Sequence, residues 1–221
     1  MRSHPRARRL ILRIDRKTAQ PIVTVPAGVS NREALRFIEK SKDWLIRNTS
    51  DSEPVKTLAP GQSIPLRGVQ HTICHGEKLS RPVISLDQEI WVKGAPEHHS
   101  RRLMDWLRAE ARADLSQRVA VHAASLGAKP GRITVRDTTS RWGSCSARGS
   151  LSFSWRLILA PPDVLDYVAA HEVAHLKQMN HSPRFWRHVE ALIPDYEAPR
   201  KWLKRHGSGL HAYRREKIST P

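Results

Sequence analysis

The sequence predicts an α+β protein in which a β-rich N-terminal part is followed by a part that combines helices and strands. Two observations predict this order. In the first hundred residues, short apolar runs are separated by turn residues, which is typical of strands. From about residue 97 onward, longer stretches rich in alanine, leucine and arginine predict helices. We therefore divide the chain into a β-rich region with one helix (residues 1–96), a second region (residues 97–206) and a basic tail (residues 207–221).

The N-terminal region is expected to begin with a hairpin and a helix. The runs at 9–15 and 21–26 alternate as strands do. Ser30 and Glu33 form a capping-box signature, which predicts the start of an amphipathic helix that reaches about residue 48. The residues expected to face a core from this helix are Leu35, Ile38, Trp44 and Leu45.

A loop or linker and a small sheet complete this region. Residues 48–61 are rich in serine, proline and glycine, which is typical of a linker. Four strand-like runs separated by turn residues follow between 63 and 94. This pattern predicts a small antiparallel sheet.

The second region is expected to begin with a long helix from about 97 to 126, ended by Gly127 and Pro130. Two strand-like runs follow at 132–137 and 150–161. The residues between these two runs are expected to include a turn.

Three further helices are expected after those strands. Pro161 and Pro162 precede the first of them, in positions where proline costs a helix least. Ser182 and Pro183 begin the second, and the third runs from about residue 195 to 205.

Composition limits the classes of function. The formal net charge is +17 at pH 7, which favours a polyanionic partner such as nucleic acid or nucleotides. The basic residues cluster at both ends: Arg2, Arg6, Arg8, Arg9, Arg13, Arg16 and Lys17, and Arg200, Lys201, Lys204, Arg205, Arg214, Arg215 and Lys217. Two cysteines are too few for a disulfide framework, and no apolar run is long enough to cross a membrane, so we expect a cytoplasmic protein.

The helix after the two prolines carries titratable side chains that are costly to bury without compensation. His171 and His175 are four positions apart, so they project from one helix face and can converge on a cation, with Glu172 beside them. This is the H-E-x-x-H arrangement of zinc hydrolases. If Asn180 ends the helix, His181 can supply a third nitrogen and leave a fourth position for water, as catalytic zinc requires. We therefore predict one Zn²⁺ per chain.

This site predicts hydrolysis. Zinc lowers the pKa of a bound water to about 7, and Glu172 can take its proton and return it to the leaving group. By their chemistry alone, four other side chains are candidates for contacts with substrate or transition state: Arg141, Trp142, His188 and Tyr196.

The stretch from Arg141 to Trp186, which includes "RWGSC" and "SWRLILAPPDVLDYVAAHEVAHLKQMNHSPRFW", resembles the YgjP-like metallopeptidase family. Its site is similar to that of the SprT and Spartan proteases. The resemblance implies a zincin-like helical/β catalytic domain with an HExxH active-site helix. In this chain it implies His171, His175 and His181 as ligands and Glu172 as base.

Two departures accompany the resemblance. Gln178 stands where metzincins place a glycine and no Met-turn follows, so we exclude the metzincin family. Ser154 stands where the YgjP-like pattern has asparagine.

Three functions remain open from the sequence. The first is a zinc peptidase with a peptide or protein substrate, associated with nucleic acid through its basic surfaces. The second is a metal-dependent hydrolase of nucleotide phosphoanhydrides. The third is a nucleic-acid-binding module with a structural metal, against which Glu172 argues, because a closed structural site has no use for an adjacent base.

Overall fold

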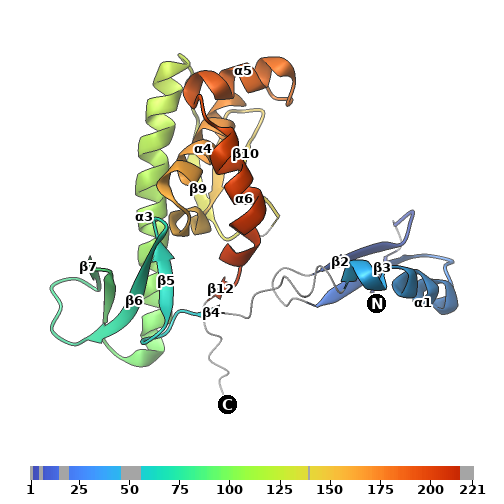
Figure 1. Cartoon of the computed structure of the whole chain (residues 1–221), viewed down its shortest axis with the longest axis horizontal. Helices are drawn as coiled ribbons and strands as arrows, with labels where there is room; N and C mark the ends of the chain where they lie inside the picture. The colour runs from blue at the N-terminus through green and yellow to red at the C-terminus, as the bar shows by residue number, and fades with distance from the viewer. Residues whose placement is uncertain (1, 5–6, 15–19, 46–55, 139, 215–221) are drawn as a thin grey trace. The chain divides into compact units, whose positions relative to one another are not determined.

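The computed structural model describes residues 2–4, 7–14, 20–45, 56–138 and 140–214 (Figure 1). The chain forms two compact units, 1–54 and 55–221. Strands dominate the earlier half of the chain and helices the later half, which confirms the predicted α+β class. None of the helices in the described ranges is both long and apolar enough to span a membrane.

The first unit contains a three-stranded sheet of order β1-β3-β2. Strands β2 and β3 pair antiparallel, which confirms the predicted hairpin, and β1 pairs with β3 in parallel. The bounds of its elements are β1 Arg2–His4, β2 Ile11–Ile14, β3 Pro21–Pro26 and α1 Asn31–Lys40.

Helix α1 begins at the predicted capping box. The Glu33 amide donates to Oγ of Ser30, and the Glu33 carboxylate accepts from the Ser30 amide. The small core of this unit joins the buried Ala34 to the sheet, so Leu35, on another face, is 56% exposed. The predictions that Leu35 and Trp44 face the core are therefore wrong, since Trp44 is 38% exposed. Helical backbone resumes at 42–45, and the predicted end at residue 48 lies outside the described residues.

The second unit begins with a four-stranded sheet of order β5-β6-β8-β7. The four predicted strands are present, but the sheet is mixed, because β6 and β8 run parallel. Strand β7 pairs antiparallel with the outer side of β8, which leaves the other edge of β8 for β6. The bounds are β5 Ser63–Leu66, β6 Val69–Gly76, β7 Val83–Leu86 and β8 Glu89–Lys93.

This sheet shares one hydrophobic core with the helices. Ile64, Ile73 and Ile90 are buried in the same cluster as Leu103 of α3 (Pro96–Ser125). Because this sheet shares its core with the helices, it belongs to the second unit. The boundary between the units lies between residues 54 and 55, whereas the sequence analysis placed it after residue 96.

The rest of the second unit surrounds helix α4, which packs against α3, β10, α5 and α6 (Figure 1). The bounds are β9 Ile133–Arg136, β10 Gly143–Cys145, β11 Leu151–Ser154, a 3₁₀ helix Trp155–Leu159, α4 Pro162–Ala174, α5 Pro183–Leu192 and α6 Glu197–Leu210. Strand β10 lies at the edge of a sheet of order β10-β11-β9. The predicted strand at 150–161 is thus confined to its first residues.

The end of the described chain is more ordered than the predicted tail. Helix α6 continues past the predicted end at residue 205 to Leu210. Strand β12 (Tyr213–Arg214) then pairs with β4 (Lys56–Thr57), inside the predicted linker. Both cysteines, Cys74 and Cys145, are free thiols.

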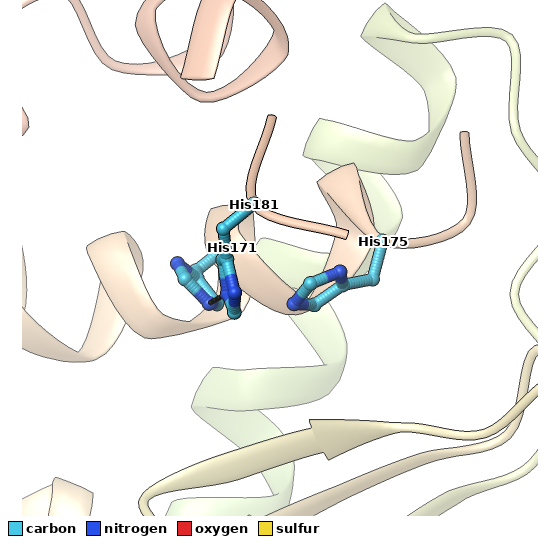
Figure 2. A group of neighbouring side chains, drawn as sticks. All are labelled: His171, His175 and His181. Carbon is cyan, nitrogen blue, oxygen red and sulfur yellow. Dashed lines mark hydrogen bonds between the residues drawn. The ribbon is translucent and has the colours of Figure 1, made fainter. Parts of the chain in front are cut away.

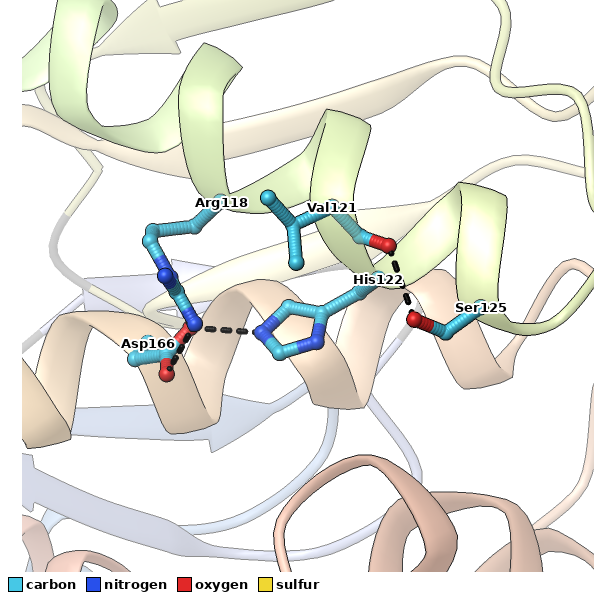
Figure 3. A network of polar contacts seen from close by, with 5 residues as sticks. All are labelled: Arg118, Val121, His122, Ser125 and Asp166. Atoms are coloured by element: carbon cyan, nitrogen blue, oxygen red, sulfur yellow. Dashed lines mark hydrogen bonds and ion pairs between the residues drawn. The ribbon is translucent and has the colours of Figure 1, made fainter.

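A partly buried polar network joins α3 to α4 (Figure 3). Arg118 donates through Nε and Nη2 to the two carboxylate oxygens of Asp166, and the Nη2–Oδ2 distance is 2.7 Å. Nε2 of His122, which is 3% exposed, contacts the same carboxylate at 2.5 Å. Burial raises the pKa of Asp166, but the hydrogen bonds from His122 and Arg118 outweigh it and keep this pKa below its ordinary value. Asp166 therefore fixes α4 against α3.

We predict that Asp166→Asn lowers the free energy of unfolding at pH 7 by about 2 kcal/mol, the usual contribution of charged hydrogen bonds. Because folding lowers the pKa of Asp166, its carboxylate stabilises the fold above the unfolded pKa of about 4, and this contribution is lost as the pH falls. Urea unfolding at pH 7 and pH 3 measures both effects. Asp163→Asn, an exposed site in the first turn of α4, is the control and should cost less. A loss of the same size at both pH values would contradict the assignment.

Candidate metal centre

Three histidines converge at the C-terminal end of α4 (Figure 2). His171 lies in the last turn of the helix, His175 is the C-cap residue, and His181 lies just before α5. The amide of His175 still donates to the carbonyl of His171, so the spacing of one helical turn is retained. One ligand atom from each histidine lies within 4.8 Å of the other two. The sequence prediction that the three side chains come together is thus matched by their placement.

The backbone leaves the helix earlier than predicted. We expected Asn180 to end the helix, but α4 ends at Ala174 and tight turns follow, in which the amides of Leu176 and Lys177 bond three residues back. Asn180 instead orders the return segment, since its Oδ1 accepts from Nε2 of Gln178 at 2.7 Å. This return places His181 opposite His171.

The donor set fits a metal ion. Nε2 of His171 and Nε2 of His181 are 3.1 Å apart. Nitrogens bound tetrahedrally to zinc lie about 3.3 Å apart, given Zn–N distances of about 2.0–2.1 Å. Nδ1 of His175 lies 3.1 Å from the carbonyl oxygen of Gln178, which requires a proton on Nδ1 and leaves Nε2 free to bind a metal. These are the features expected of a three-nitrogen metal site.

The surroundings favour neutral imidazoles, the form that binds metals. Burial, together with the neighbouring His175 and His181, lowers the pKa of His171 to about 3. Burial also lowers the pKa of His175. Near neutral pH the imidazoles of His171 and His175 are therefore uncharged, and each has one ring nitrogen with a lone pair available to a cation.

Glu172 lies beside this cluster with its side chain buried, at 5% exposure. Burial raises its pKa to about 8, while the positive charge of Arg141 lowers it. Its carboxylate packs against the backbone of Gly143 in β10. The side chain is thus confined between the metal-site helix and the edge strand.

An aromatic wall supports the histidines, and the sequence prediction of site residues missed it. The buried ring of Phe185 lies 4.9 Å from His171, 4.5 Å from His175 and 4.8 Å from His181 between ring centroids. Trp186 lies 5.9 Å from His171. The signal that could have found both residues is their position directly after the His-Ser-Pro turn.

The structure places the four additional candidates differently from one another. Arg141 is exposed and acts on Glu172 through its charge. Tyr196 stacks on Trp186 at 5.4 Å, one ring away from the histidines. Trp142 stacks instead on His211 at 4.8 Å, beside α6.

The fourth candidate, His188, and Ser154 each have a buried polar atom without a hydrogen-bond partner among the described residues. These atoms are Nε2 of His188 and Oγ of Ser154. No ring contact among those residues joins His188 to the three histidines. Neither residue has a described role in the cluster.

Comparison with known proteins identifies the family. Residues 8–206 match the model of the YgjP-like metallopeptidase domain. No curated protein matches the chain. Among solved structures, the chain is similar to the metallopeptidase zymogen of Pyrococcus abyssi abylysin, at 21% identity and a TM-score of 0.38, over 41% of this chain and 93% of that one. Because the family model spans most of the sequence, the protein belongs to the YgjP-like metallopeptidase family.

Proposed function

We propose that this protein is a zinc-dependent peptidase in which His171, His175 and His181 bind one Zn²⁺ and Glu172 is the general base. The observation that carries the proposal is the convergence of three imidazoles beside one buried carboxylate. Three protein nitrogens leave a coordination position open for water or substrate, as catalytic zinc requires.

The proposed reaction is hydrolysis of a peptide bond. A bound zinc ion would lower the pKa of water and polarise the scissile carbonyl group. Glu172 accepts a proton from the attacking water and delivers it to the leaving amine. Burial makes Glu172 a stronger base than an exposed carboxylate, and the charge of Arg141 offsets some of that effect. Phe185 and Trp186 hold the imidazole rings in place.

Two alternatives have less support. Family membership favours a peptide substrate over a nucleotide phosphoanhydride. A purely structural zinc needs four protein ligands, and the histidine cluster contains three among the described residues. Cys145 does not belong to that cluster. A peptidase therefore accounts for more of the observations than either alternative.

We predict that His181→Ala lowers the zinc content well below one ion per chain, because one of three protein ligands is removed. Elemental analysis after dialysis measures the content. His98→Ala removes an exposed histidine of α3 and should leave zinc unchanged. One tightly held zinc per chain in the His181 variant would exclude it as a ligand.

We predict that Glu172→Gln keeps the zinc but lowers peptide hydrolysis by at least ~10²-fold, because the amide cannot accept the proton. Cleavage of casein or a fluorogenic peptide by the zinc-loaded protein measures the rate. Glu190→Gln, on an exposed position of α5, is the matched control and should retain full activity. Equal rates for the Glu172 variant and the wild type would remove Glu172 from the mechanism.

We further propose that the basic surface of α6 associates the protein with nucleic acid. Lys201, Lys204 and Arg205 are exposed on this helix, whereas Arg200 is paired with Glu197. The net charge of +17 gives the same expectation for the chain as a whole. Such contacts go to phosphates and carry no base information, so we expect weak sequence preference.

We predict that DNA binding weakens steeply with salt, with a slope of log K against log salt of about −4 for five phosphate contacts. Replacing Lys201, Lys204 and Arg205 with Gln should reduce the slope by about 2–3 and leave zinc content and peptide cleavage intact. Replacing the exposed Lys78, Arg81 and Arg101 with Gln is a charge-matched control. Fluorescence anisotropy with labelled duplex measures the binding, and no binding at low salt would refute the proposal.

A further inference from the structure

The backbone conformation at Gly143 in β10 does not require a glycine. Its φ lies outside the left-handed region that favours glycine, and it pairs with Phe153 in an antiparallel ladder. Glycine inside a strand weakens the strand and often marks the close approach of another group. The reason for the glycine must therefore be sought in what lies against it.

The group that approaches is the side chain of Glu172. A methyl group added to Gly143 would lie 2.6 Å from Cγ and 2.7 Å from Cδ of Glu172. Real Cβ atoms essentially never approach other atoms this closely. The stem of the glutamate thus fills the space that a side chain at residue 143 would need.

The strand cannot retreat to make room. Phe153 and Leu151 of the neighbouring β11 are fully buried in the core, and they pair with Gly143 and Cys145. One residue before Gly143, the carbonyl oxygen of Trp142 accepts a hydrogen bond from the amide of Ser154 at 2.8 Å.

The indole of Trp142 is held as well. It stacks on His211, and a methyl group at Gly207 would lie 3.0 Å from its ring. The segment around Gly143 is therefore fixed by β11 on one side and by α6 on the other.

Helix α4 cannot retreat either. Asp166 binds it to Arg118 and His122 of α3. Ala169 and Val173, which lie before and after Glu172 in the helix, are fully buried. If a side chain were added at residue 143, the carboxylate of Glu172 would have to move.

We propose that Gly143 is a positioning residue: its missing side chain admits the Glu172 carboxylate to one place beside the three histidines. This inference rests on the proposed function, in which that carboxylate is the base. Gly143 acts through Glu172, and its own atoms do not participate in the reaction.

The first test compares Gly143→Ala with Ser144→Ala, the next residue of the same strand. In crystal structures of the zinc-loaded proteins, the Glu172 carboxylate should be displaced by about 1 Å or more in the Gly143 variant alone. Displacements of that size cost an enzyme roughly 10²-fold in rate. We therefore expect kcat for a peptide to fall roughly 10–100-fold, with KM and zinc content little changed. An undisplaced carboxylate, or an equal fall in the Ser144 variant, would overturn the proposal.

The second test is a double-mutant cycle with Glu172→Ala, whose side chain lacks Cγ, Cδ and the carboxylate that a methyl group at residue 143 would meet. Gly143→Ala should lower the midpoint of urea unfolding when Glu172 is present, and this fall should be absent in the Glu172→Ala background, because no atom remains for the methyl group to displace. The same cost in both backgrounds would show a merely structural glycine. If Gly143→Ala does not fold, the double variant should restore folding, and its failure to do so would overturn the proposal.

The outcomes separate this inference from the proposed function. A wild-type protein that binds zinc and cleaves no peptide would overturn the peptidase proposal. The displacement of the carboxylate in the crystal would still decide whether Gly143 positions Glu172.

Discussion

The convergence of three imidazoles beside one buried carboxylate at the end of α4 is the constraint on which the second unit depends. Polar groups removed from water destabilise a fold unless partners compensate them. Nδ1 of His175 lies near a carbonyl oxygen, and Nε2 of His171 and Nε2 of His181 lie 3.1 Å apart, whereas the buried Nδ1 of His171 has no hydrogen-bond partner among the described residues. A metal ion bound by the three nitrogens would compensate these groups, and membership of a metallopeptidase family implies such an ion.

The apolar character of α4 follows from its central position in the second unit. The helix is buried against α3, β10, α5 and α6, so alanine, valine and leucine are found on most of its sides. Its polar exceptions have specific partners. Asp166 holds Arg118 and His122 near the start of the helix, and the histidines occupy its end. The anchor and the site lie on one rigid element, so the position of the site is set by packing at a distance from it.

The edge strand β10 and helix α4 approach each other where Gly143, which has no side chain, faces the long side chain of Glu172. Gly143 lies on an extended backbone, and Glu172 fills the space above it. Burial in this position raises the pKa of the glutamate to about 8.

The sequence by itself determined the order of the main helices and larger strands and the three histidines that come together. Local rules suffice for these, since helical spacing brings His171 and His175 to one face and the Ser30 capping box begins α1. The tertiary structure alone decided the parallel pairing of β6 with β8 and the approach of Gly143 to Glu172. These depend on which surfaces pack together between residues far apart in the chain, and no local pattern encodes that choice.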